Sequence, residues 1–229
     1  MKSVLITGGT VRLGAAIAAR LRAEGWRIIT SSHRADAGAD IVADLAEPMG
    51  PAKLYAATLK LLNGNPPDAL VNNAALFTGD AATIGAINLE APKKLTMLMA
   101  GREAGVGAVV NILDSVILGS PGSVGSRGLT LSDFKDSKDP KRPYLASKRE
   151  LLAFTKTAAA TFAATLRVNG VAPGPVMAPT DVHEKAGEML LDRRPTAEDV
   201  AAAVSYLLGA ESVTGAILPI DAGQHLVEA

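Results

Sequence analysis

Apolar and polar positions alternate in blocks along this chain, and the blocks predict strands followed by helices. Short apolar runs bounded by glycine or polar residues are typical of strands that a parallel sheet buries on both faces. Such runs predict strands at 4–6, 27–31, 40–43, 69–71, 108–113, 167–171 and 216–220. Helical periodicity predicts helices at 15–21, 52–62, 82–104, 145–165 and 197–208. We expect Pro92 to bend the third helix and Gly25 to cap the first. The alternation indicates one α/β domain over residues 1–229, in which a doubly wound, seven-stranded parallel sheet has helices on both faces.

Composition and charge narrow the classes of function. The chain has 229 residues, of which 48% are hydrophobic and 20% charged, as in a globular domain with a substantial core. Its 23 basic and 23 acidic residues cancel, which gives no electrostatic reason to expect nucleic acid or an anionic membrane as partner. Cysteine is absent and the three histidines lie far apart, so we expect no disulfide and no metal site. No apolar run reaches the roughly 18 residues of a spanning helix, and we expect a cytoplasmic protein without a signal peptide.

The first predicted strand runs into a glycine-containing turn at 7–14, and the turn runs into a helix. This arrangement makes an anion site, because free backbone N–H groups and the helix dipole face a phosphate. Gly8 and Gly14 permit a close approach of the backbone. Taken alone, two glycines favour an ordinary strand–helix connection, so the prediction of a dinucleotide site depends on residues downstream.

The residues after the second strand indicate which dinucleotide binds. An NAD-binding unit places an acidic residue there, about 20 residues after the glycine turn, to bind the ribose hydroxyls. This chain has Ser31-Ser32-His33-Arg34 instead, and Arg12 lies in the glycine turn. Arginine makes charge-assisted contacts to phosphate, so these residues favour NADP(H) and its 2′-phosphate. No acidic residue follows until Asp36, and the alternative is that Arg34 is simply solvated.

Tyr144 and Lys148 lie one helical turn apart, at the start of the predicted helix 145–165. A phenol has an ordinary pKa of about 10, and a nearby ammonium lowers that pKa because it favours the phenolate. Tyr144 thereby becomes a proton donor or acceptor usable near neutral pH. Such a pair alone is usually structural, but behind a dinucleotide site it is specific.

With this pair, the chain resembles the short-chain dehydrogenase/reductase family over nearly its whole length. The matching segments are 7–14, Asp44, 72–74, Asn88, Tyr144 with Lys148, 169–174 and 213–215. The resemblance implies a Rossmann fold in which Tyr144 exchanges the proton, Lys148 holds the nicotinamide ribose and Asn88 supports a proton relay. It also implies that Asp44 meets the adenine, Asn72 the adenosine ribose, and Pro173 with Gly174 the nicotinamide. The full cofactor site that we expect comprises Gly8, Arg12, Leu13, Gly14, Ser32, His33, Arg34, Asp44, Leu45, Asn72, Ala74, Tyr144, Lys148, Pro173, Gly174 and Val176.

Two positions depart from the family pattern. The glycine turn carries Arg12 where the family usually has glycine, and Asp114 stands where the family has its catalytic serine. Both departures are similar to the pteridine reductase branch, which also has a phenylalanine at the position of Phe77. The resemblance implies that Phe77 stacks on a pterin. We also expect Asp114, Arg12 and the neighbouring Ser115 to lie at the substrate.

The chemistry of a carboxylate at position 114 supports this interpretation. An ionised carboxylate only accepts hydrogen bonds, so it repels the oxyanion that forms when a ketone is reduced but receives the N–H groups of a pterin. We therefore predict an NADPH-dependent reductase that reduces the C=N bond of a dihydropteridine by hydride transfer, with Tyr144 and Asp114 delivering the proton. The first alternative is a carbonyl or 3-oxoacyl reductase in which Ser115 takes the serine role. The second is a non-catalytic NADPH-binding sensor.

The segment 119–143 is long, rich in glycine and serine, and lies between Asp114 and Tyr144. Such a loop is usually functional or disordered, so we expect either a lid over the substrate or a solvated insertion. The resemblance also implies a homo-tetramer or homo-dimer, in which the two long helices pair between subunits.

Overall fold

A computed structural model describes residues 1–103, 105–119, 141–176 and 189–227. Seven parallel strands form one sheet in the order β3-β2-β1-β4-β5-β6-β7. Their bounds are β1 (Ser3–Thr7), β2 (Arg27–Ser32), β3 (Ile41–Val42), β4 (Ala69–Asn72), β5 (Gly107–Ile112), β6 (Leu166–Pro173) and β7 (Ile217–Ile220). The predicted strands and the doubly wound Rossmann fold are confirmed. The strand order reverses between β1 and β4, and open α/β sheets bind their ligands at the carboxyl edge of such a point.

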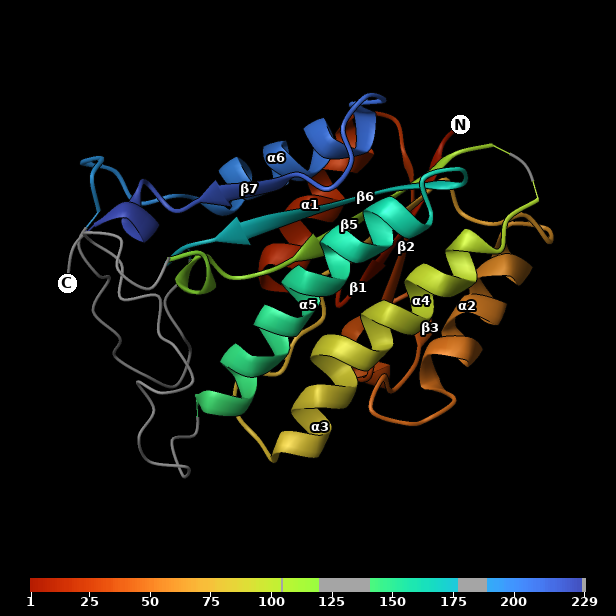
Figure 1. Cartoon of the computed structure of the whole chain (residues 1–229). Helices are drawn as coiled ribbons and strands as arrows, with labels where there is room; N and C mark the ends of the chain where they lie inside the picture. Colours follow the sequence, from red (N-terminus) through yellow and green to blue (C-terminus); the bar gives the residue numbers. More distant parts are fainter. Residues whose placement is uncertain (104, 120–140, 177–188, 228–229) are drawn as a thin grey trace.

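Helices cover both faces of the sheet (Figure 1). The helices α1 (Arg12–Ala23) and α6 (Ala197–Gly209) pack on one face, whereas α2 (Gly50–Leu61), α4 (Ala91–Ala100) and α5 (Arg142–Thr161) pack on the other. Successive side chains of a strand point to opposite faces. Accordingly, Val4 and Ile6 of β1 join the core beneath α1 and α6, and Leu5 joins the core beneath the other three helices.

The end of α1 is a Schellman cap, as the prediction for Gly25 requires. Gly25 has a φ of +84°, which L side chains rarely adopt. Its N–H donates to the carbonyl of Arg22, and the N–H of Trp26 donates to the carbonyl of Leu21. The cap turns the chain directly into β2.

The helix expected at 82–104 is wrong as one continuous helix. The structure has a short helix α3 (Ala81–Gly85), a π turn η2 (Ala86–Glu90) and then α4, which ends at Ala100. Pro92 has no N–H with which to continue the α-helical pattern. The wider π turn before it holds one extra residue and changes the direction in which its side chains point.

The helix predicted at 145–165 begins earlier, at Arg142, and ends at Thr161. Pro143 explains the early start, because its fixed φ suits the first turn of a helix. This extension places Tyr144 inside the first turn. The predicted lid at 119–143 falls mainly on residues 120–140, which lie outside the described residues. Among the helices in the described part of the chain, none is long and apolar enough to cross a membrane.

Candidate active site

The end of β5 and the first turn of α5 bring Asp114 and Tyr144 together. Asp114 caps the short 3₁₀ helix η3 (Ser115–Ile117), and its Oδ1 accepts a hydrogen bond from the N–H of Val116 at 3.0 Å. Its Oδ2 accepts a hydrogen bond from the hydroxyl of Tyr144 at 2.7 Å. That distance is typical of a hydroxyl that donates to an ionised carboxylate. Asp114 therefore fixes the position of the Tyr144 oxygen, while Ser115 beside it is buried.

Lys148 lies one turn after Tyr144 and is fully buried. Its Nζ donates to the carbonyl oxygen of Ile112 at 2.8 Å and lies 5.7 Å from the centroid of the Tyr144 ring. Burial lowers the pKa of Lys148 to about 8, and the negative charge of Asp114 opposes part of that shift. The predicted pair of tyrosine and lysine thus shares one face of α5, with the carboxylate of Asp114 beside it.

We expect Lys148→Met to abolish turnover while it raises the free energy of unfolding at pH 7, because an apolar chain of similar length replaces a buried ammonium. The folded pKa of Lys148 lies below its unfolded value, so the wild-type protein gains stability as pH rises above about 8. The gain between pH 7 and 9 is about 1 kcal/mol, and the variant lacks it.

Urea unfolding at both pH values measures this effect. Lys156→Met, at an exposed position on the same helix, is the control and should show no pH-dependent difference from the wild type. If the stability difference of Lys148→Met stays constant between pH 7 and 9, the ammonium is not the cause.

The ring of Phe77 lies against the ring of Tyr144. Its ring centroid is 4.7 Å from that of Tyr144, with the ring planes at 56°. The Nζ of Lys141 lies 6.0 Å from the centroid of the Phe77 ring. Phe77 keeps 37% of its surface exposed. An exposed aromatic edge beside a buried tyrosine makes an apolar wall for a planar ligand. Lys141 did not stand out in the sequence, because only the start of α5 at Arg142 places it there.

Asn88 is buried in the π turn and holds the segment that carries Phe77. Its Oδ1 accepts from the N–H of Leu76 at 2.7 Å, and its Nδ2 donates to the carbonyl of Leu76 at 2.9 Å and to Ser147 Oγ at 3.2 Å. Ser147 in turn donates to the carbonyl of Tyr144. The structure therefore brings Asn88 to the backbone beside Tyr144 and Phe77, and its part in a proton relay stays a prediction.

Side chains to which the sequence analysis assigned no role of their own fix the conformation of the glycine turn. Thr7 Oγ1 accepts hydrogen bonds from the N–H groups of Asn73 and Ala74, and Asn73 Nδ2 donates to the carbonyls of Thr7 and Gly8. A Cβ at Gly14 would lie 2.1 Å from the Gly8 carbonyl oxygen. Only glycine fits at position 14, and the signal for Asn73 was its place in the paired asparagines after β4.

The predicted phosphate-binding residues gather where β1 and β2 end. Thr7 pairs with Ser31 in the sheet, so the glycine turn and the segment 32–34 leave the carboxyl edge side by side. Arg12 is exposed and has a φ of +48°, in the left-handed region where the family usually has glycine. Arg34 is exposed as well, and its guanidinium binds the carboxylate of Asp36.

The remaining predicted cofactor residues divide into surface and interior positions. Asp44 Oδ1 accepts from the N–H of Ala46, and Leu45 is buried. Asn72 is buried and donates to Asn111 on β5, so its side chain points along the sheet. An adenosine contact from Asn72 therefore stays a prediction.

The end of β6 supplies the other predicted cofactor residues. Gly174 donates to the carbonyl of Ile220, and a Cβ at Gly174 would lie 2.6 Å from the Cβ of Asp221. Pro173 and Val176 flank this close approach and are half-buried. The contact fixes the end of β6 against the end of β7.

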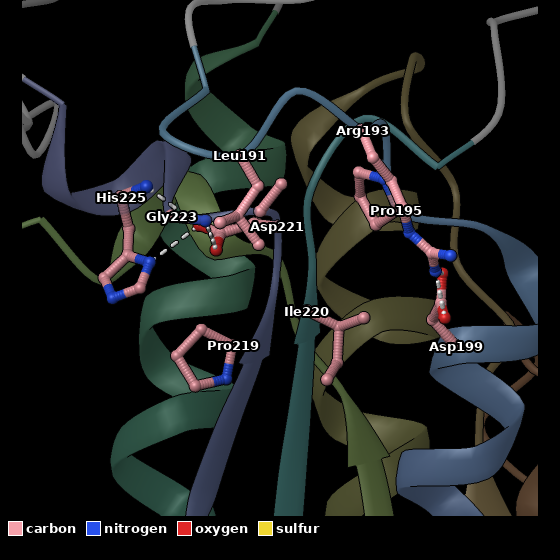
Figure 2. Close-up of a pocket in the computed structure, with 10 residues that line it drawn as sticks. Leu191, Arg193, Pro195, Asp199, Pro219, Ile220, Asp221, Gly223 and His225 are labelled. Carbon is pink, nitrogen blue, oxygen red and sulfur yellow. Dashed lines mark hydrogen bonds and ion pairs between the residues drawn. The ribbon is translucent and has the colours of Figure 1, made fainter.

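A pocket of about 300 Å³ lies at the end of β7 (Figure 2). The buried carboxylate of Asp221 accepts hydrogen bonds there from the backbone N–H and, at 2.7 Å, the Nδ1 of His225. His225 belongs to the short helix η4 (Gln224–Leu226), which contacts η3, the 3₁₀ helix that Asp114 caps. His225 is one of the three histidines whose wide separation in the sequence predicts no metal site. Within the described ranges, no group of three or more histidine or acidic residues is arranged to hold a metal ion.

Known proteins of similar sequence and fold indicate the family of this chain. The sequence model of the family described as enoyl-(acyl carrier protein) reductase matches residues 11–225. The protein FixR of Bradyrhizobium diazoefficiens is 30% identical over 98% of this chain and 87% of its own length. Pteridine reductase 1 of Leishmania tarentolae is 26% identical over 98% of this chain and 96% of its own length.

A solved structure is also similar to this chain over nearly its whole length. FolM alternative dihydrofolate reductase 1 from Brucella canis, complexed with NADP, superimposes with a TM-score of 0.78 and 28% identity, over 99% of this chain and 95% of that one. These two relatives confirm the predicted resemblance to the pteridine reductase branch. The match over residues 11–225 and the whole-length relatives show that the chain belongs to the short-chain dehydrogenase/reductase family of oxidoreductases.

Proposed function

We propose that this protein is an NADPH-dependent reductase that reduces the C=N bond of a dihydropteridine. The observation that carries the proposal is the hydrogen bond of 2.7 Å between the Tyr144 hydroxyl and Asp114 Oδ2, at the position where the family usually has serine. The similarity to pteridine reductase 1 and to the FolM protein supports the same substrate class.

The glycine turn and the N-terminus of α1 fit the phosphate groups of a dinucleotide cofactor. The helix α1 has Val11 at its N-cap, and no side chain caps its first N–H groups. Those N–H groups are available to a phosphate at the helix N-terminus. Gly8 and Gly14 leave the turn without side chains on its close-packed side. NADP in the Brucella canis structure supports the choice of cofactor, and Arg12 with Arg34 would hold the 2′-phosphate.

Side chains of this protein would supply the proton that the substrate nitrogen takes up. When bound, NADPH would supply a hydride to the carbon of the C=N bond, and the nitrogen would take up a proton. Tyr144 holds that proton on its phenol oxygen, and Lys148 stabilises the phenolate that remains. Asp114 accepts hydrogen bonds from the N–H groups of the heterocycle and keeps the Tyr144 phenol in place. Phe77 covers one face of the ring and excludes water from it.

Ser115 supports a second candidate, reduction of a carbonyl group. It follows Asp114 directly and is buried at the start of η3, where a rotation of the segment would present a hydroxyl donor instead of a carboxylate. The two candidates differ in what they demand of position 114. A carbonyl reductase needs a donor at the substrate oxygen, whereas a pteridine reductase needs an acceptor for N–H groups.

The loss of NADPH absorbance with a dihydropterin, set against a panel of ketones and 3-oxoacyl thioesters, tests the proposal. We expect turnover with the dihydropterin and little with the panel. Turnover of ketones alone would establish the second candidate. The homo-oligomer and the cytoplasmic location stay predictions.

We further expect Arg34→Ala to raise KM for NADPH about tenfold and to leave KM for NADH nearly unchanged, because a charge-assisted contact to the 2′-phosphate is lost. Steady-state kinetics with both cofactors measure the effect. Arg22→Ala, at an exposed arginine in the last turn of α1, is the control and should change neither value. Equal use of both cofactors by the wild type would refute the assignment of NADPH.

A further inference from the structure

Arg34 and Asp36 form a two-point ion pair just beyond the end of β2. Arg34 Nε donates to Asp36 Oδ1 at 3.0 Å, and Arg34 Nη2 donates to Asp36 Oδ2 at 2.7 Å. This parallel arrangement is the one by which arginine also binds a phosphate. The hydrogen bonds and the attraction between the charges raise the pKa of Arg34 and lower the pKa of Asp36, so both groups are charged at neutral pH.

The loop that carries this pair is anchored at both ends. Ser32 Oγ accepts from the N–H of Arg34 at 3.1 Å. Beyond the pair, Asp40 Oδ2 accepts from the N–H and the hydroxyl of Thr30 at 2.7 and 2.8 Å. Between the anchors, Asp36 lies in the short 3₁₀ helix η1 (Ala35–Ala37). The loop therefore presents Arg34 and Asp36 together, at the edge where β2 lies beside β1 and the glycine turn.

We propose that Asp36 competes with the 2′-phosphate of NADPH for Arg34, and so limits the preference of this protein for NADPH over NADH. The inference rests on the proposed binding of NADPH at this edge. A carboxylate satisfies the guanidinium until a phosphate displaces it. NADH has no 2′-phosphate, so its ribose hydroxyls leave the ion pair intact. Asp36 is then a specificity-determining residue, although it lies beyond the position at which NAD-binding units place their acid.

The exposure of the pair makes the competition possible. The side chains of Arg34 and Asp36 are 63% and 70% exposed. An exposed ion pair contributes little net stability, so a ligand displaces it readily. Removing the carboxylate frees Arg34 and also removes a negative charge that the incoming phosphate must approach. In water with moderate salt, these effects predict a gain of about three- to tenfold in NADPH affinity.

The test compares the affinities of the wild type and Asp36→Asn, which needs no turnover. Fluorescence or calorimetric titration gives Kd for NADPH, NADH, 2′,5′-ADP and 5′-AMP. We expect Asp36→Asn to tighten NADPH and 2′,5′-ADP about three- to tenfold, and NADH and 5′-AMP less than twofold. The gain should shrink as salt rises. Glu198→Gln removes the same charge from a carboxylate of similar exposure, which pairs with Arg20, and should change no affinity.

A double mutant separates competition from simple repulsion. In an Arg34→Ala background, Asp36→Asn should no longer tighten NADPH, because the residue for which the two anions compete is gone. A full gain in that background, or an equal gain for NADH, would overturn the inference. Unchanged affinity in Asp36→Asn would overturn it too, and NADPH binding by the wild type would still stand. A wild type that binds NADH alone would instead refute the proposed cofactor.

Discussion

Tyr144→Phe is expected to abolish turnover while NADPH still binds. The substitution removes one hydroxyl, and with it the proton that the substrate nitrogen requires. It also leaves Asp114 Oδ2 without the donor that lies 2.7 Å away. Removal of a positioned general acid lowers kcat about 10²- to 10⁴-fold. The buried ring and its contact with Phe77 remain, so we expect the fold and the cofactor affinity to stay close to those of the wild type.

Single-turnover kinetics and NADPH titration measure the two quantities separately. Tyr55→Phe is a matched control, because Tyr55 is buried to the same degree in α2 but lies on a different helix. It should keep its full kcat. If Tyr144→Phe keeps a kcat near that of the wild type, the proton comes from another group and the proposed mechanism fails.

The sheet and the position of the catalytic candidates follow from local sequence. Val4, Leu5 and Ile6 are apolar on both faces of a strand, and only a sheet covered by helices on both sides buries them all. The spacing of Tyr144 and Lys148 is one helical turn, so a shared face follows from helix geometry alone. Asp114 falls at the end of an apolar strand, and a strand end in a parallel sheet points to the ligand edge.

Other features depend on hydrogen-bond partners that the local sequence does not show. The π turn depends on how Pro92 is accommodated while Asn88 reaches Leu76 and Ser147. The sequence shows the proline but not those partners. The pairing of Arg34 with Asp36 depends on a loop anchored by Asp40. Whether the side chains of two residues this close in sequence point toward each other depends on the type of turn, which residue propensities alone do not specify.

The contact between Phe77 and Tyr144 is of the same kind. Asn88 fixes the backbone before Phe77, and the early start of α5 brings Tyr144 against the ring. From the sequence, Phe77 was predicted to contact the substrate by resemblance only. In the structure its ring lies against that of Tyr144, the group that we propose delivers the proton.

The variants at positions 114 and 77 are expected to separate the two candidate functions. Asp114→Asn keeps the shape of the side chain but removes its charge, so it weakens the acceptor for the pterin N–H groups and loosens the hold on the Tyr144 hydroxyl. We expect kcat for a dihydropterin to fall about 10²-fold with a smaller change in KM. Phe77→Leu keeps apolar surface but loses ring stacking, which raises KM about two- to tenfold.

Ser115→Ala is the matched comparison, because Ser115 is the neighbour of Asp114 and the residue on which a carbonyl reductase would depend. For a pteridine reductase it should be nearly silent, and Asp114→Ser should improve whatever weak ketone reduction exists by supplying a donor to the oxyanion. A carbonyl reductase would give the reverse result, with Ser115→Ala damaging and Asp114→Asn silent. Kinetics of these variants on a dihydropterin and a ketone therefore decide between an acceptor and a donor at the substrate. A silent Asp114→Asn would end the case for a pteridine.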